Sequence, residues 1–171
     1  LQEGVAAEAA SLAGHLALDN LTILYDSNDV TLDAMANASQ SESVIDRFTA
    51  YGYHCIRVEG GHDLEEICHA LAQARANKGK PTFIEFKTLI AKGIPEVAGT
   101  AGGHGEGGAK FAESARLGLG LPEEPFYVSD EARGFFQQRT AEQVENRKRW
   151  NETFQAWRAA NPEKAALLDS G

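Results

Sequence analysis

Three short apolar runs alternate with stretches of helical periodicity in the first half of the chain. The apolar runs cover residues 21–25, 53–58 and 82–86, and helices are predicted over residues 2–18, 42–50 and 64–77. This order is typical of parallel βαβ units with right-handed crossovers. Because each run is apolar nearly throughout, we expect strands that are buried on both faces. The pattern therefore predicts an α/β fold, with a parallel sheet and helices on both of its faces.

The pattern changes in the second half of the chain. Residues 87–108 contain seven glycines and no clear period, which indicates a surface loop. A short helix over residues 109–117 and a long amphipathic helix over residues 132–159 follow. We therefore expect an α/β part over residues 1–128 and a long carboxyl-terminal helical extension over residues 129–171.

Polar residues mark the starts of two of these helices. Ser39 or Ser41 is expected to cap the second helix, and Asp63 is expected to cap the third. His62 lies in the segment Gly-Gly-His-Asp, where we expect it to shape the turn that precedes the third helix.

Composition excludes some classes of partner. The chain has 171 residues, of which 43% are hydrophobic and 24% charged, as in ordinary globular domains. Its formal net charge of −9 argues against nucleic acid and against anionic membranes as partners. No apolar run approaches the length of a membrane span. Cys55 and Cys68 show no metal-binding spacing and favour a reduced, cytoplasmic setting.

The most informative polar segment directly follows the first apolar run. Residues 25–33 read Tyr-Asp-Ser-Asn-Asp-Val-Thr-Leu-Asp, and ligands of open parallel sheets bind beyond the carboxyl ends of strands. Asn28 can offer a side-chain oxygen and Val30 a main-chain oxygen, which suit Mg²⁺ shared with a phosphorylated ligand. An ordinary strand-to-loop turn rich in Asp and Asn is the alternative interpretation.

The second candidate is the histidine in the glycine-rich segment over residues 99–108. Flanking glycines let the backbone approach a ligand, and His104 can donate a hydrogen bond to a phosphate or to a developing alkoxide. The segment matches neither a phosphate-binding P-loop nor a dinucleotide fingerprint. A flexible loop with an exposed histidine is the alternative.

Three further charged residues allow two interpretations each. Glu3 lies near the amino end of the first helix, where the helix dipole stabilises a carboxylate whether or not it has another role. Lys87 and Lys92 could contact a phosphate, although solvated lysines are the usual case.

In their order and spacing, these segments resemble the thiamin-diphosphate-binding domain of transketolase. The resemblance runs from residue 1 to about residue 168 and is strongest over residues 3–108. It rests on residues 1–4, 11–14, 25–33, 47–54, 61–63, 80–82, 87–88, 99–100, 104–105 and 125–126.

The resemblance implies thiamin diphosphate and Mg²⁺ as cofactors, with Ca²⁺ as a substitute for Mg²⁺. Asn28 and the main-chain oxygen of Val30 match ligands of the metal that holds the diphosphate. Ile90 matches a residue that lines the thiamin pocket, and His104 matches a catalytic histidine that contacts both cofactor and substrate. Glu3 matches a glutamate of a catalytic carboxylate network at the dimer interface.

The implied reaction is transfer of a two-carbon ketol unit from a ketose phosphate to an aldose phosphate. The family acts as a homodimer with a pyrimidine-binding domain, and an upstream Gly-Asp-Gly supplies a further metal ligand. Since this chain starts after that motif, we expect the isolated chain to be inactive. A related thiamin enzyme such as a dihydroxyacetone synthase, or a noncatalytic scaffold module that keeps the fold, remain as alternatives.

Three departures from the family pattern are visible. Asp29 replaces the usual small residue after the asparagine, which affects the shape of the loop. The loop over residues 34–40 is shorter and lacks aromatic residues. Residues 106–109 replace Ala-Pro-Leu-Gly, and we expect this change to alter the substrate entrance.

Overall fold

The computed structural model describes residues 3–104 and 107–171 and divides the chain into two compact units. The first unit is Leu1–Leu121 and the second is Pro122–Gly171. The expected division between residues 128 and 129 therefore stays a prediction.

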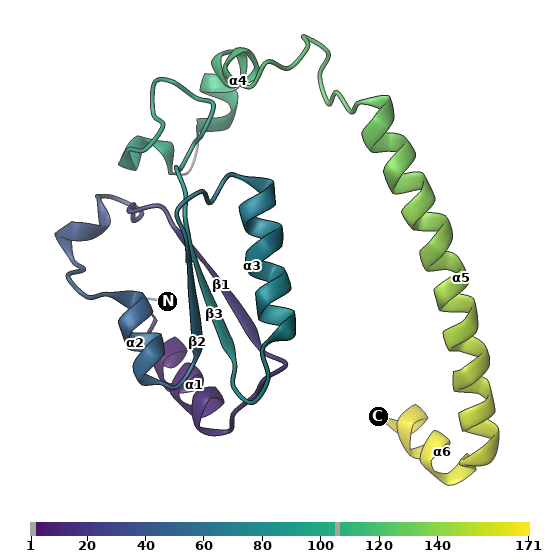
Figure 1. Cartoon of the computed structure of the whole chain (residues 1–171). Helices are drawn as coiled ribbons and strands as arrows, with labels where there is room; N and C mark the ends of the chain where they lie inside the picture. The colour runs from purple at the N-terminus through teal and green to yellow at the C-terminus, as the bar shows by residue number, and fades with distance from the viewer. Residues whose placement is uncertain (1–2, 105–106) are drawn as a thin grey trace. The chain divides into compact units, whose positions relative to one another are not determined.

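The first unit contains a parallel sheet, with helices between its strands (Figure 1). Its elements are α1 (Gly4–His15), β1 (Thr22–Ser27), the 3₁₀ turn η1 (Ala36–Ala38), α2 (Val44–Ala50), β2 (His54–Val58), α3 (Leu64–Ala76), β3 (Thr82–Lys87), the 3₁₀ turn η2 (Ala101–Gly103) and α4 (Gly107–Gly118). The predicted α/β alternation is confirmed.

The central strand of the described sheet is the last one in sequence. The order is β1-β3-β2, with both pairs parallel, and Thr82 of β3 faces Thr22 on one side and His54 on the other. This position buries β3 on both faces, so that Phe83 and Ile84 are each 0% exposed. The apolar run over residues 82–86 is thus explained by its central place.

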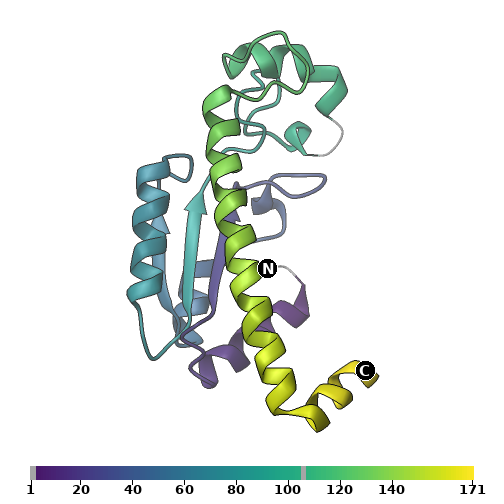
Figure 2. The same ribbon diagram turned by 90° about the vertical axis from the view of Figure 1, so that its right-hand side faces the viewer.

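Helices cover both faces of the sheet, as predicted (Figure 2). Phe83 points to a cluster formed with α1 and α2, which contribute Ala10, Ala13, Val44 and Phe48. Ile84 points to the opposite cluster, to which α3 contributes Ala70 and Ala74. Successive strand residues face opposite sides of a sheet, so β3 serves both halves of the core.

The expectation that all three strands are buried on both faces is wrong for β1. Its burial alternates along the strand, and Leu24 is 55% exposed. Ile23 and Tyr25 pack against the cluster of α1 and α2, while Leu24 points to the other face. The reason is coverage, since α3 packs over β2 and β3 and the cluster it forms with them contains no residue of β1.

The expected caps are right for one helix and wrong for the other. Asp63 accepts hydrogen bonds from the backbone amides of Glu65 and Glu66, at 2.8 and 3.3 Å, and caps α3. The cap of α2 is Ser43, whose hydroxyl accepts from the Asp46 amide at 3.3 Å, and not Ser39 or Ser41. The helix starts later because η1 and the turn after it use the preceding residues.

The second unit consists of α5 (Asp130–Ala160) and α6 (Pro162–Ser170). Stacked rings of Trp150, Phe154 and Trp157 follow one another along α5. An ion pair between Arg158 and Asp169 joins the two helices. Among the helices of the described residues, none combines the length and apolar character that crossing a bilayer requires.

Candidate cofactor site at the carboxyl end of the sheet

The segment after β1 is a compact, hydrogen-bonded turn and not an extended polar loop. Val30 and Met35 form an antiparallel bridge. The amide of Ala36 donates to the carbonyl oxygen of Asp29 at 2.8 Å, which closes the turn. We call residues 28–36 the ligand turn. Its closure holds the predicted ligands in a defined backbone conformation.

The two predicted metal ligands are adjacent in this turn. Oδ1 of Asn28 accepts a hydrogen bond from the Val30 amide at 3.1 Å, and a carbonyl oxygen keeps a second lone pair for another partner. The main-chain oxygen of Val30 accepts no hydrogen bond from the residues that the structure describes. Both oxygens therefore remain available to a hard cation.

These oxygens alone do not make a complete metal site. Within the described residues, no group of three or more His, Cys, Asp or Glu side chains is arranged to hold a metal. A neutral amide and a main-chain carbonyl suit Mg²⁺ when a diphosphate supplies charge and further oxygens. The donor set thus fits a metal shared with a phosphorylated cofactor.

The ammonium group of Lys87 is bound by oxygens of neighbouring residues. It lies 3.0 and 3.2 Å from the two carboxylate oxygens of Asp29 and donates to Oγ of Ser27 at 3.1 Å. An ammonium has three donors, and three oxygens from the end of β1 and the ligand turn take them. The sequence pattern did not predict this arrangement.

The sequence pattern also did not predict an ion pair that lines the hollow beside the ligand turn. Nε and Nη2 of Arg57 lie 2.9 and 2.8 Å from Oε2 of Glu85, which is only 6% exposed. The hydrogen bond and charge of Glu85 raise the pKa of Arg57, which secures its positive charge. These residues and Lys87 line a hollow of about 670 Å³. The sequence did contain a signal for this pair, since each of two apolar runs includes one such charged residue. In the sheet, Arg57 and Glu85 face each other in register.

The segment after β3 is attached to its neighbours on both sides. The amide of Thr88 donates to the carbonyl oxygen of Ser27 at 3.3 Å, and the amide of Gly61 donates to that of Lys87 at 3.1 Å. The hydroxyl of Thr88 also contacts the carboxylate of Asp26. The three strand ends thus form one connected edge.

Ile90 and His104 belong to one loop cluster beyond β3. The carbonyl oxygen of Ile90 accepts from the amide of Gly99 at 3.0 Å. A side chain at Gly103 would lie 3.0 Å from Cβ of Ala91 and 3.3 Å from Cγ2 of Ile90, so only glycine fits there comfortably. His104 follows directly and is exposed.

The two predicted loops lie at the same end of the sheet, but no direct contact joins their ligands. Figures 1 and 2 show the ligand turn and the loop after β3 beyond the carboxyl ends of the strands. Within the described residues, no hydrogen bond joins Asn28 to His104, and neither residue lines the hollow of Arg57, Glu85 and Lys87. The expected change at the substrate entrance involves residues 106–109. Residue 106 lies outside the described part of the chain, and residues 107–109 form the start of α4.

Glu3 lies at a separate place, beside the segment that precedes α2. It is exposed, directly precedes α1 and makes no capping hydrogen bond within the described part of the chain. It lines a hollow of about 370 Å³ together with Gln40, Glu42 and Arg47. The carboxylates of Glu3 and Glu42 thus border the same hollow.

The fold defines a class: an open α/β domain, in which ligands generally bind beyond the carboxyl ends of the parallel strands. Residues 1–170 match the family model described as "Transketolase, thiamine diphosphate binding domain". The chain belongs to this family.

Individual relatives agree with this assignment. The chain is 56% identical over 171 residues to a transketolase of Physarum polycephalum and 52% identical to one of Dictyostelium discoideum, each over 99% of this chain. The solved transketolase of Leishmania mexicana has a TM-score of 0.84 at 35% identity and covers 98% of this chain. The chain spans about a quarter of these proteins, 26% of the two curated relatives and 25% of the solved chain.

Proposed function

We propose that this chain forms part of a transketolase that transfers a two-carbon ketol unit from a ketose phosphate to an aldose phosphate. Membership of the thiamin-diphosphate-binding family supports the cofactor. The observation that carries the proposal is the pair of available oxygens on Asn28 and Val30 at the carboxyl end of β1. This reaction belongs to the pentose phosphate pathway.

The ligand turn holds the metal in this proposal. Asn28 and the main-chain oxygen of Val30 bind Mg²⁺, or Ca²⁺ as a substitute, and the ion offsets the charge of the diphosphate. Such an ion is needed on a chain whose formal net charge is −9. Ile90 lines the thiamin pocket. When bound, thiamin diphosphate supplies the chemistry that breaks and forms the carbon–carbon bond, and the protein supplies placement and proton transfers.

His104 contacts the cofactor and the sugar substrate in this proposal. Its imidazole can donate a hydrogen bond to an oxygen that becomes negatively charged, or carry a proton to it. Its exposed position after η2 supports a role toward a ligand, because the fold does not need its side chain for packing.

The rest of the site comes from outside this chain. We infer that a pyrimidine-binding domain, an upstream acidic metal ligand and a second copy of the protein complete it, so that the isolated chain is inactive. The exposed face of α1 supports a homodimer, since Val5, Leu12 and Leu16 are 72%, 57% and 56% exposed. Glu3 at the start of this helix then belongs to a catalytic carboxylate network at the interface.

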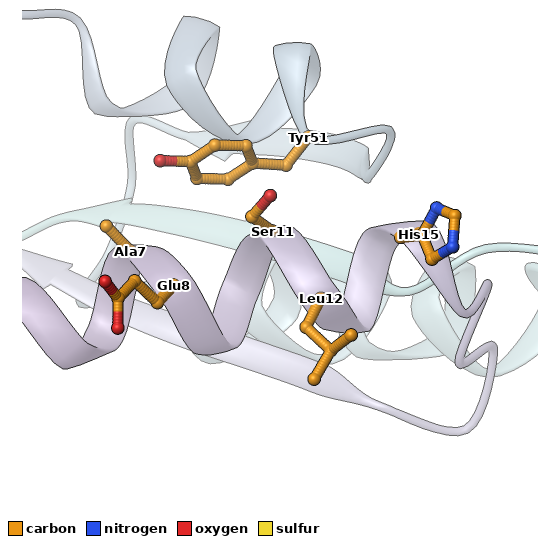
Figure 3. A pocket seen from close by; sticks show the side chains of 6 residues that line it. All are labelled: Ala7, Glu8, Ser11, Leu12, His15 and Tyr51. Atoms are coloured by element: carbon orange, nitrogen blue, oxygen red, sulfur yellow. The ribbon is translucent and has the colours of Figure 1, made fainter.

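The outer side of α1 is also hollowed. Figure 3 shows the side chains of Glu8, Ser11, Leu12 and His15 along one side of α1, with the ring of Tyr51 lying across Ser11. A partly apolar, indented helix surface is suited to a protein partner.

A cytoplasmic location also belongs to this proposal, supported by the free thiols of Cys55 and Cys68.

A comparison of acceptors tests the proposed reaction. The full-length protein that carries this chain is assayed with xylulose 5-phosphate as donor and either ribose 5-phosphate or formaldehyde as acceptor. Transfer to ribose 5-phosphate supports a transketolase. Transfer to formaldehyde alone indicates a dihydroxyacetone synthase, and no transfer to either acceptor indicates a noncatalytic scaffold.

A further inference from the structure

We propose that Lys87 and Asp29 form a latch that positions the ligand turn. The proposal rests on the proposed function for the identity of the ligand. Lys87 is thereby a positioning residue, which acts on the metal through Asn28 and Val30 without contacting it.

The first argument is the backbone conformation of Asp29. Its φ is +61°, in the left-handed region that non-glycine residues occupy at some cost. Aspartate tolerates this region better than most side chains, but glycine would be relaxed there. The presence of a carboxylate at such a position indicates that its side chain makes a compensating interaction, and Lys87 provides one.

The second argument is the anchorage of Lys87. It is the last residue of β3 and faces Ser27, the last residue of β1, in the register of the sheet. Ser27 is only 4% exposed, and the side chain of Lys87 is 31% exposed. The ammonium therefore joins a strand end to the ligand turn, whose other hydrogen bonds within the described residues are local.

The third argument is charge. Asp29 lies between the two proposed metal ligands, and its side chain is 68% exposed. A carboxylate without a partner at this place would repel a diphosphate and compete for the cation. Pairing with Lys87 neutralises the carboxylate and holds it at the end of β3.

Hydrogen exchange of the full-length protein without cofactor tests the latch itself. Lys87→Met should speed exchange of the Val30 and Ala36 amides by about threefold to tenfold, while the amides of α3 stay unchanged. Lys92→Met, which removes an exposed lysine from the segment after β3, is the matched control. Asp29→Asn removes the same ion pair at its more exposed partner and should speed exchange of the same two amides. It keeps the test decisive if Lys87→Met fails to fold. Unchanged exchange in both variants overturns the latch.

A double-mutant cycle tests its effect on the ligand. Lys87→Met and Asp29→Asn should each weaken Mg²⁺-dependent binding of thiamin diphosphate by about threefold to tenfold. The affinity of the double variant should be no lower than that of the single variant that binds less tightly. Losses that multiply in the double variant overturn the proposal, because they show independent roles. If the unaltered protein shows no Mg²⁺-dependent binding, the proposed function and the role in metal binding both fail, while hydrogen exchange still decides whether the latch exists.

Discussion

The backbone amide of Leu89 donates a hydrogen bond to Nε2 of His62 at 2.8 Å. This contact connects the turn after β2 to the segment after β3, which leads directly to Ile90. His62 was expected to shape its own turn, and it also acts across the sheet edge. Because Nε2 is the acceptor, the imidazole carries its proton on Nδ1 in this arrangement.

Removing this acceptor should loosen the segment that precedes Ile90. His62→Phe keeps a ring of similar size but cannot accept the hydrogen bond, whose loss is worth roughly 1 kcal/mol. We expect exchange of the Leu89 amide to become about fivefold faster, as measured by hydrogen exchange. His69→Phe, on the exposed side of α3, is the control. Equal exchange at Leu89 in both variants would show that the contact does not stabilise the segment.

Gly14 allows α1 to pack against the end of α2. A Cβ at this position would overlap the carbonyl oxygen of Tyr51, which is a backbone atom that cannot turn aside. Gly14→Ala should therefore lower the free energy of unfolding by about 1–3 kcal/mol, as measured by urea denaturation. In Gly4→Ala, at the start of the same helix, the new Cβ meets open space and stability should not fall. Equal stability of the two variants would contradict this packing.

The two cysteines should differ in reactivity. Burial raises the pKa of Cys55, and a hydrogen bond from Thr49 opposes this shift only in part. Cys68 lies exposed on α3. Because the thiolate is the reactive form, iodoacetamide at pH 7.5 should modify Cys68 at least about tenfold faster than Cys55. Mass spectrometry of partly labelled protein measures this ratio, and preferential labelling of Cys55 would contradict the packing of α2 against β2.

His104→Ala should reduce turnover without disturbing the fold. Loss of a group that moves a proton or stabilises an oxyanion costs roughly 10²–10³-fold in kcat. The melting temperature should not change, because His104 is exposed. His69→Ala removes another exposed histidine, within α3, and should retain full activity. A His104→Ala variant with unaltered kcat would end the catalytic assignment.

The sequence predicted the main features of this fold because burial and periodicity are local patterns. The central strand reads as a continuous apolar run since both of its faces are covered, and Phe83 and Ile84 show this directly. The same reasoning overestimated the burial of β1, because a sequence does not reveal which strands a helix covers. Leu24 is the residue where that prediction failed.

The polar contacts around the site were less predictable. Arg57 pairs with Glu85, and Lys87 with Asp29, across 28 and 58 residues of sequence. Such pairs depend on the register of neighbouring strands, which the order of elements alone does not fix. Asn28 and the main-chain oxygen of Val30 could be proposed from the sequence because a polar segment directly follows the first apolar run. Their supporting contacts became visible only once β1 and β3 were placed side by side.

Titration calorimetry of thiamin diphosphate, with and without Mg²⁺, tests the central claim most directly. The full-length protein should bind the cofactor in a Mg²⁺-dependent manner, and Asn28→Leu should weaken that binding at least about tenfold, as loss of a metal-site interaction does. Asn37→Leu, an equally drastic change at an exposed position of η1, should leave the affinity unaltered. Equal affinities for the unaltered protein and Asn28→Leu would contradict the assignment of this turn as the metal site.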